Sequence, residues 1–429
     1  MMSFESAPPF AAPLRFFLTA PLFALLAGLL IAIEGPDIFA SRWMPATLAV
    51  THLLTVGFML QVMLGALIQI LPVVAGANLS RPLLIATIVH IGLTLGALLL
   101  AAGFYFGRPD WFSAAAVLLA ITVVVFLSAA LSALLRVPST SPTIRGLKLA
   151  SLSLVVVVGL GMLMALAMAY GWALPLPALA DLHAAWGFGG WAGILLAAMA
   201  YVVVPMFQLT PGYPARPSWW FPFGMLALLL LWSGAVLAGW PAGIRISQLL
   251  AAILGLAFAG LTLRLQSKRR RARADVTYRY WQLGLAASVF ALFMLLTAAL
   301  WPAVAEPNAW TLIFGILLIA GGFLPFIIGM LYKIVPFLAW LHLQNEGKAK
   351  VPAPNMSKIL PNDDMQRQMN AYVVTLILLL AAVLQPEWLS RTAGLCLTLV
   401  SGWLWLNLFS AIQRYRKHKQ EILAKLAAL

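Results

Sequence analysis

Charged side chains are scarce in this sequence, and acidic ones are the scarcest. Asp, Glu, Lys and Arg make up 9% of the 429 residues, and only 12 residues are acidic. Hydrophobic residues account for 63%, and the mean hydropathy is +0.97. Because a soluble domain carries about 25% charged residues, this composition excludes a water-soluble globule. Long continuous apolar runs, without period-two alternation, predict a helical membrane protein and exclude a barrel.

Cysteine and the familiar catalytic motifs are also missing. Cys396 is the one cysteine, so an internal disulfide is excluded. The sequence contains no P-loop, no GxSxG elbow, no HExxH and no CxxC. The first residues, 1–13, lack the basic region of a cleavable signal peptide. The sequence therefore assigns no enzymatic class to the chain.

Carboxylates are absent from the interior of the long apolar runs. Every Asp and Glu falls in a loop or at the edge of a run. Ion-coupled transporters usually keep an acidic or equivalent polar group within the membrane, because such a group is costly and is retained for function. This absence disfavours a proton- or sodium-coupled transporter.

What the sequence does contain is an internal repeat. Three similar stretches, Thr51–Pro72, His183–Pro205 and Phe314–Pro336, each run apolar to a closing proline. The closing prolines lie 133 and 131 residues apart. Each stretch has a small residue seven positions before its proline, at Gly65, Ala198 and Gly329. Repetition at this period predicts three similar units in one membrane domain.

Hydropathy predicts an all-α polytopic membrane protein with twelve transmembrane helices, in which spans 2, 6 and 10 are equivalent by pseudo-threefold repetition. Each run is long enough, or nearly so, to cross about 30 Å of hydrocarbon. The predicted spans are residues 14–34, 47–75, 82–105, 111–135, 147–171, 182–207, 219–239, 244–265, 277–300, 311–338, 369–386 and 389–411.

Basic residues gather in the loops after even-numbered spans, which predicts that both termini are cytoplasmic. The loops and the tail account for the net charge of +15, so we expect the bilayer and not nucleic acid as the partner. The whole chain, 1–429, is predicted as one transmembrane domain of a bacterial-type cytoplasmic (inner) membrane. Residues 342–368, including His342, are predicted as a cytoplasmic loop. Residues 412–429 are predicted as a basic cytoplasmic tail that continues span 12 or lies on the inner leaflet.

Histidines at the openings of spans 2 and 6 are the candidate ligands. His52 and His183 both fall near the outer edge of the hydrocarbon, and neutral imidazole is the commonest protein ligand for haem iron and copper. The alternative is that they bind headgroups or water. Asp181 is a candidate orienting partner for His183. His90, inside span 3 at a different depth, is a third candidate metal ligand, with a hydrogen bond to a backbone carbonyl as its alternative role.

Polar residues also stand one turn before two of the closing prolines. Proline removes a helix hydrogen bond and leaves a carbonyl free. We therefore expect Gln69 and Tyr332 to satisfy those carbonyls, and Lys333 to extend to the inner surface.

Together, these features resemble a known superfamily. The segments PLRFFLTAPLFALLAG, THLLTVGFMLQVMLGALIQILP and HAAWGFGGWAGILLAAMAYVVVP, with twelve spans and a histidine opening span 2, resemble subunit I of haem-copper oxidases and nitric oxide reductases. They also resemble the NnrS-type haem-copper membrane proteins. The resemblance implies a haem b or copper held by His52. It further implies that Arg391, between spans 11 and 12, lies where the oxidases hold haem propionates.

The departures from that superfamily limit the function. Span 10 (Phe314–Pro336) and span 7 contain no histidine, so the dinuclear oxygen-reducing centre is missing and terminal oxidase activity is not expected. The NnrS-type His-x-His is here the single His52. A haem at His52 would take as its second ligand His183, a methionine such as Met59 or Met63, or none.

Three hypotheses follow. The first is an integral membrane haem- or copper-binding protein of this superfamily, acting in the nitric oxide or oxygen response or in electron relay. The second is a permease for a small apolar or metal-containing solute, since the prolines at 72, 205, 325 and 336 suggest broken helices. The third is a cofactor-free scaffold for a respiratory-chain subunit.

Overall fold

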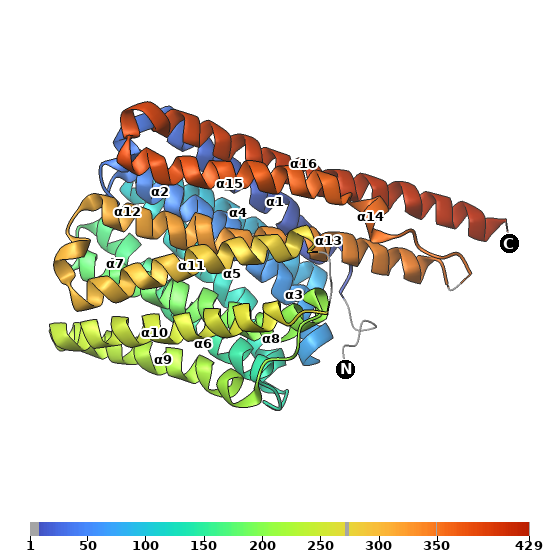
Figure 1. Cartoon of the computed structure of the whole chain (residues 1–429), viewed down its shortest axis with the longest axis horizontal. Coiled ribbons are helices and arrows are strands. Elements are labelled where there is room, and N and C mark those ends of the chain that lie inside the picture. The colour runs from blue at the N-terminus through green and yellow to red at the C-terminus, as the bar shows by residue number, and fades with distance from the viewer. Residues whose placement is uncertain (1–7, 271–273, 349, 429) are drawn as a thin grey trace.

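The computed structural model describes residues 8–270, 274–348 and 350–428, and Figure 1 shows them as a bundle of long helices. The twelve expected spans are confirmed, each as one continuous helical segment. Regular structure in the described part of the chain is entirely helical. The chain is therefore an all-α polytopic membrane protein.

The elements that make up the spans are as follows. Span 1 is α1 (Ala11–Glu34) with η2 (Gly35–Phe39). Span 2 is α2 (Pro45–His52), η3 (Leu53–Leu60) and α3 (Gln61–Ala75). Spans 3 to 5 are α4 (Pro82–Phe106), α5 (Pro109–Leu135) and α6 (Pro142–Tyr170). Span 6 is α7 (Leu176–Ala185), η4 (Trp186–Gly193) and α8 (Ile194–Gln208). Spans 7 to 9 are α9 (Ala215–Leu237), α10 (Pro241–Ser267) and α11 (Val276–Leu300), followed by η5 (Pro302–Ala305). Span 10 is α12 (Asn308–Ile316), η6 (Leu317–Phe323) and α13 (Leu324–Glu346). After α14 (Met356–Ile359), spans 11 and 12 are α15 (Asn362–Leu384) and α16 (Pro386–Ala427).

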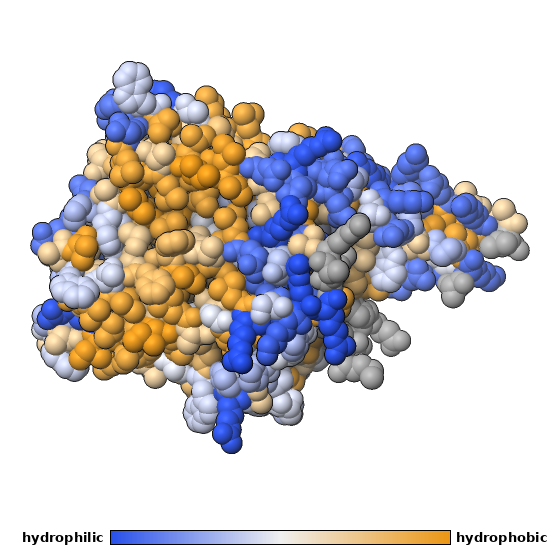
Figure 2. Space-filling view, in the orientation of Figure 1, coloured by the Kyte–Doolittle hydropathy of each residue, from blue (hydrophilic) through white to orange (hydrophobic). Residues whose placement is uncertain are grey.

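An apolar belt crosses the middle of one face of the bundle. Figure 2 shows hydrophobic side chains across the central part of the visible face and hydrophilic ones gathered at the end where α16 projects. The start of α1 lies toward that same end in Figure 1, which we call the basic end. The belt is the surface that a lipid bilayer covers.

The predicted loop at 342–368 is wrong in extent, because helices enter it from both sides. α13 continues to Glu346, and α15 begins at Asn362 with Asp363 and Asp364 in its first turn, where acidic residues favour a helix N-terminus. His342 is therefore a helical residue, and its ring stacks on Phe10 with centroids 5.2 Å apart.

The basic tail continues span 12. α16 is a single helix of 42 residues, about 63 Å long at 1.5 Å per residue. Its last part projects beyond the bundle in Figure 1. Leu429 of the predicted tail lies outside the described residues.

Spans 2, 6 and 10 each contain a π-helical segment at the same place. η3, η4 and η6 begin at Leu53, Trp186 and Leu317, each 19 residues before its closing proline. π-Helices are rare, and short ones occur frequently at functional sites. Their recurrence at equivalent positions shows that the three units share backbone geometry as well as sequence pattern.

Each π-segment carries a glycine that packs against the first helix of its own unit. A β-carbon on Gly57 would lie 2.3 Å from Phe23 in span 1. One on Gly190 would lie 3.0 Å from Ser153 in span 5, and one on Gly321 would lie 2.7 Å from Ala287 in span 9. Glycine is needed here because the neighbouring helix occupies the space of a side chain.

The small residues eight positions later make a second contact with the same helices. A β-carbon added to Gly65 would lie 2.7 Å from the side chain of Phe16 in span 1, and one added to Gly329 would lie 2.8 Å from that of Tyr280 in span 9. In the second unit the glycine is on the other helix: a β-carbon added to Gly146 of span 5 would lie 2.6 Å from the β-carbon of Ala198. Two close contacts per unit therefore fix spans 1 and 2, 5 and 6, and 9 and 10 as matching pairs.

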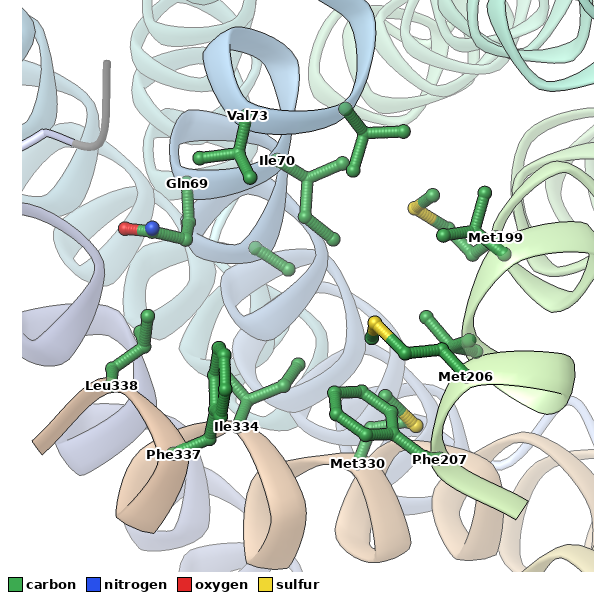
Figure 3. Close-up of a pocket in the computed structure, with 14 residues that line it drawn as sticks. Gln69, Ile70, Val73, Met199, Met206, Phe207, Met330, Ile334, Phe337 and Leu338 are labelled. Atoms are coloured by element: carbon green, nitrogen blue, oxygen red, sulfur yellow. The ribbon is translucent and has the colours of Figure 1, made fainter. Parts of the chain in front are cut away.

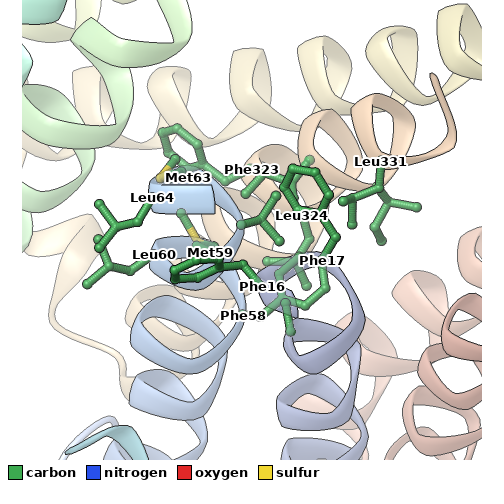
Figure 4. Packing of buried hydrophobic residues seen from close by; sticks show 14 of the residues in the cluster. Phe16, Phe17, Phe58, Met59, Leu60, Met63, Leu64, Phe323, Leu324 and Leu331 are labelled. Carbon is green, nitrogen blue, oxygen red and sulfur yellow. The ribbon is translucent and has the colours of Figure 1, made fainter. Parts of the chain in front are cut away.

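The second helices of the units form the interior of the bundle. In the most apolar 18-residue windows of spans 2, 6 and 10, 83%, 56% and 67% of residues are buried. Figure 4 shows part of this core, where Met59, Met63 and Phe58 of span 2 meet Phe16 and Phe17 of span 1 and Phe323 of span 10. Spans 2, 6 and 10 therefore form the core of the bundle.

The prolines do not break these helices. Pro72, Pro205 and Pro336 lie inside α3, α8 and α13, and Pro325 stands in the first turn of α13, where a proline is tolerated. The expectation of broken helices is therefore wrong, and the irregular backbone is at the π-segments instead.

The glycine contact leads to a testable prediction. We expect Gly57→Ala to lower stability by about 1–3 kcal/mol, because its methyl group overlaps the Phe23 ring in a packed core. Gly159→Ala in α6 is the matched control, since nothing lies within 4 Å of its β-carbon. Thermal unfolding of both variants in detergent measures the difference. Equal midpoints for the two variants would contradict the packing role.

Candidate functional site

Spans 2 and 6 place His52 and His183 near the end of the bundle opposite the basic end. Each histidine is the eighth residue of its helix, α2 or α7, and both helices begin at that end in Figure 1. Both side chains are partly exposed. The structure therefore places the two histidines that the sequence singled out separately at the same end of the bundle.

His52 is held in place by its own helix and by span 3. Its Nδ1 bonds to the carbonyl oxygen of Leu48, 2.8 Å away, one turn earlier in α2. Its ring stacks on Phe104 of α4, with centroids 4.8 Å apart and planes 25° apart. Because His52 is the last residue before η3, the change of helical pitch begins directly after it.

His183 is held by span 5. Its Nδ1 bonds to the carbonyl oxygen of Val157 in α6 at 3.1 Å. A β-carbon on Gly161, one turn further along α6, would lie 3.1 Å from Cε1 of the ring. Gly161 therefore leaves the space in which the imidazole lies.

Asp181 does not orient His183, contrary to expectation. Its carboxylate accepts a hydrogen bond from Nη1 of Arg42 at 2.7 Å, which joins the start of span 6 to the loop before span 2. Both side chains of this ion pair are more than a third exposed, so its contribution to stability is small.

The Nε2 atoms of both histidines are unused. A carbonyl oxygen can only accept, so Nδ1 carries the proton in each ring and Nε2 keeps its lone pair. In the described part of the chain neither Nε2 has a hydrogen-bond partner. Metal-binding histidines are usually arranged in this way, with one nitrogen on a backbone carbonyl or carboxylate and the other on the metal.

The donor set is small, and this decides which metal fits. Among the described residues no group of three or more His, Cys, Asp or Glu side chains could hold a metal ion. Zinc sites use three or four protein ligands, so the pair falls short of zinc. Imidazole suits copper, and Cu(I) accepts as few as two ligands. Of the metals compared, copper is the one that two imidazole donors suit.

Phe104 stacks on the face of the His52 ring and so does not cover the lone pair of Nε2, which lies in the plane of the ring. A cavity of about 130 Å³ lies beside the start of span 2, between spans 1, 2, 10, 11 and 12, and is too small for a porphyrin. Thr51 lines that cavity and His52 does not.

His90 lies away from the pair. Phe104, which contacts His52, is 14 residues further along the same helix, about 21 Å at 1.5 Å per residue. The Nε2 of His90 is engaged with the Thr19 hydroxyl at 2.9 Å, and its ring packs edge-on against Phe16. It also hydrogen-bonds the backbone of Arg15 in span 1, in agreement with the alternative role expected for it, and it cannot share a metal with His52.

Met59 and Met63 also lie apart from His52. They follow it by 7 and 11 residues and are 3% and 9% exposed within the apolar core (Figure 4). Neither is positioned as a second ligand at His52.

Arg391 is a helical residue, not a loop residue, because α16 already begins at Pro386. Its Nη1 donates to the carbonyl oxygens of Ala32 and Ile33, both at 2.9 Å, at the end of α1. The guanidinium also lies against Gly35, whose added β-carbon would be 3.0 Å from Cζ. In this position it caps a helix C-terminus, where positive charge is favourable.

Two of the polar residues near the closing prolines have other roles than expected. The Tyr332 hydroxyl accepts a hydrogen bond from Asn407 at 2.9 Å. The buried Oε1 of Gln69 has no partner in the described part of the chain. Lys333 pairs with Asp275 at 3.3 Å, at the N-terminus of α11, and so extends toward the basic end as expected.

A second cavity, which the sequence did not reveal, lies among spans 2, 6 and 10 next to the closing prolines. It measures about 60 Å³ and is bordered by 14 residues, all apolar except Gln69. In Figure 3 the amide of Gln69 points away from the opening, whereas Met199 and Met206 extend from span 6 toward span 2. Its lining could not be predicted because it depends on how three distant spans are rotated.

A scan against protein-family models and a search of curated proteins both find no match for this chain.

The capping role of Arg391 gives a prediction for this region. We expect Arg391→Met to destabilise the protein by about 1 kcal/mol, because two charge-assisted hydrogen bonds at the end of α1 are lost at an exposed site. Arg367→Met is the control, since Arg367 is equally exposed on α15 and has no hydrogen bond in the described residues. Chemical unfolding followed by tryptophan fluorescence compares them. No difference between the variants would rule out the cap.

Proposed function

We propose that the chain is an integral membrane copper-binding protein, with the copper held by Nε2 of His52 and Nε2 of His183. The observation that carries the proposal is that two histidines from different units lie at the same end of the bundle with the same arrangement of their ring nitrogens. Each has Nδ1 fixed on a backbone carbonyl and Nε2 free.

The role that this site supports is sensing or electron relay in the nitric oxide or oxygen response. A copper ion with only two protein ligands keeps positions open for a small diatomic molecule and supplies one-electron chemistry when bound. Oxygen reduction is not proposed, since spans 7 and 10 bring no further histidine to the pair. The resemblance to the haem-copper oxidase and NnrS-like superfamily remains part of this proposal, with copper favoured over haem b because the cavity beside the start of span 2 is too small for a porphyrin.

A permease remains the second candidate, supported by the cavity between spans 2, 6 and 10. Its size, about 60 Å³, restricts a solute to an ion or a very small molecule. A permease was first suggested by helices broken at the prolines, but these helices continue through Pro72, Pro205 and Pro336. If the purified protein held no metal, we would favour the third hypothesis, a scaffold for a respiratory-chain subunit.

Replacing either histidine tests the copper site. We expect the purified protein to bind copper and His52→Ala or His183→Ala to lose the copper held by the pair, because a single imidazole is a weak site. His90→Ala is the control, since its Nε2 is engaged elsewhere. The measurement is elemental analysis after anaerobic dialysis against Cu(I), with a reduced-minus-oxidised spectrum to detect haem. An undiminished copper content in both variants, or a Soret band that disappears in His52→Ala, would refute the proposal.

Gly161 gives a test that leaves both ligands in place. We expect Gly161→Leu to weaken copper binding at the pair at least tenfold, because the new side chain occupies the space of the His183 ring. Gly159→Leu is the matched control, two residues away on the same helix with nothing within 4 Å. Competition with a chromophoric Cu(I) chelator measures both affinities. Equal affinities would show that the position of His183 does not matter.

A further inference from the structure

The cavity among spans 2, 6 and 10 is lined by three methionines, Met199, Met206 and Met330. Sixteen of the 429 residues are methionine, so fewer than one is expected among 14 lining residues. Two come from span 6 and one from span 10, which places thioether sulfurs on two walls of one small space. Figure 3 shows all three side chains around the opening.

These methionines differ from the ones that fill the core. Met59 and Met63 are 3% and 9% exposed, and they serve as the adaptable filling that methionine often provides in apolar packing. Met199, Met206 and Met330 are each partly exposed and border empty space. A leucine would fill such a position equally well, so packing alone does not explain the sulfur.

We propose that this cavity is a second metal site, which binds Cu(I) through the thioethers of Met199, Met206 and Met330. Thioether sulfur is a soft, neutral ligand that selects Cu(I). Harder ions are not served here, because no carboxylate or imidazole lines the cavity and Mg²⁺, Ca²⁺ and Zn²⁺ require oxygen, nitrogen or thiolate ligands. A monovalent ion is also the charge that an apolar site without a counter-ion accommodates at least cost.

The size and place of the cavity agree with a bound ion. A volume of about 60 Å³ is large enough for an ion and excludes a larger solute. The cavity adjoins the closing prolines, toward the basic end, whereas the histidine pair lies toward the opposite end. Span 6 contributes to both, through His183 and through Met199 and Met206. The inference shares its metal with the proposed function but rests on different residues.

The test compares two triple variants of equal methionine content. Met199→Leu/Met206→Leu/Met330→Leu removes the three sulfurs with little change in volume. Met59→Leu/Met63→Leu/Met369→Leu removes three from the packed core and serves as the control. Each full-length protein is dialysed anaerobically against Cu(I) with a competing chelator. Copper is then counted, and its X-ray absorption is recorded for scattering from sulfur.

We expect about two copper ions per chain in the unaltered protein and the control, and about one in the cavity variant, which also loses the sulfur scattering. His52→Ala/His183→Ala should keep the sulfur-bound copper and lose the nitrogen-bound one. The inference is overturned if the cavity variant keeps its full copper, if no sulfur scattering appears in the unaltered protein, or if native mass spectrometry finds the cavity variant losing only a bound lipid. The two sites can fail separately. If the cavity variant loses copper and the histidine variant keeps all of its copper, the methionine site is supported and only the histidine site is refuted.

Discussion

Close contact between the first two helices of each unit is the interaction on which this fold depends. In lipid there is no hydrophobic force to bring helices together, so association relies on van der Waals packing, which small residues make possible. Gly57, Gly190 and Gly321 provide that contact at equivalent places in the three units, and each packs on the preceding helix of its own unit. Because the contact recurs three times, the second helices are all directed to the interior.

The helices at the interior then determine where chemistry is possible. Spans 2 and 6 carry one histidine each near the same end of the bundle. Backbone carbonyls of α2 and α6 fix the ring nitrogens. At the other end the same inner helices leave the methionine-lined cavity. Both features are consequences of the repeated packing, although the three units do not share the residues that make them.

Much of the fold could be predicted from the sequence, because hydropathy and repetition are properties of the chain itself. The twelve spans and the equivalence of spans 2, 6 and 10 follow from apolar runs and from the spacing of Pro72, Pro205 and Pro336. The common glycine at 57, 190 and 321 was also available in the sequence at the same spacing. The π-segments were not, since hydropathy does not report whether a helix has 3.6 or more residues per turn.

The candidate site could be predicted only in part. His52 and His183 are conspicuous because histidine is rare in apolar spans, but their proximity depends on how spans 2 and 6 are rotated. The same is true of Arg391, whose partners Ala32 and Ile33 lie more than 350 residues away in the chain. Asp181 was assigned to its neighbour in sequence, whereas the structure pairs it with Arg42. Side-chain partners between distant helices are set by packing, which no local pattern encodes.

The π-segments also constrain how this chain can change length over evolution. Deleting one residue of α8 between η4 and Ala198 would rotate everything after it in span 6 by about 100° relative to η4. Met199, Met206 and the contact at Ala198 would then face different neighbours, while the equivalent parts of spans 2 and 10 stayed in place. Insertions and deletions are therefore tolerable in the connecting loops. Within spans 2, 6 and 10, however, the number of residues between the π-segment and its closing proline has to stay fixed.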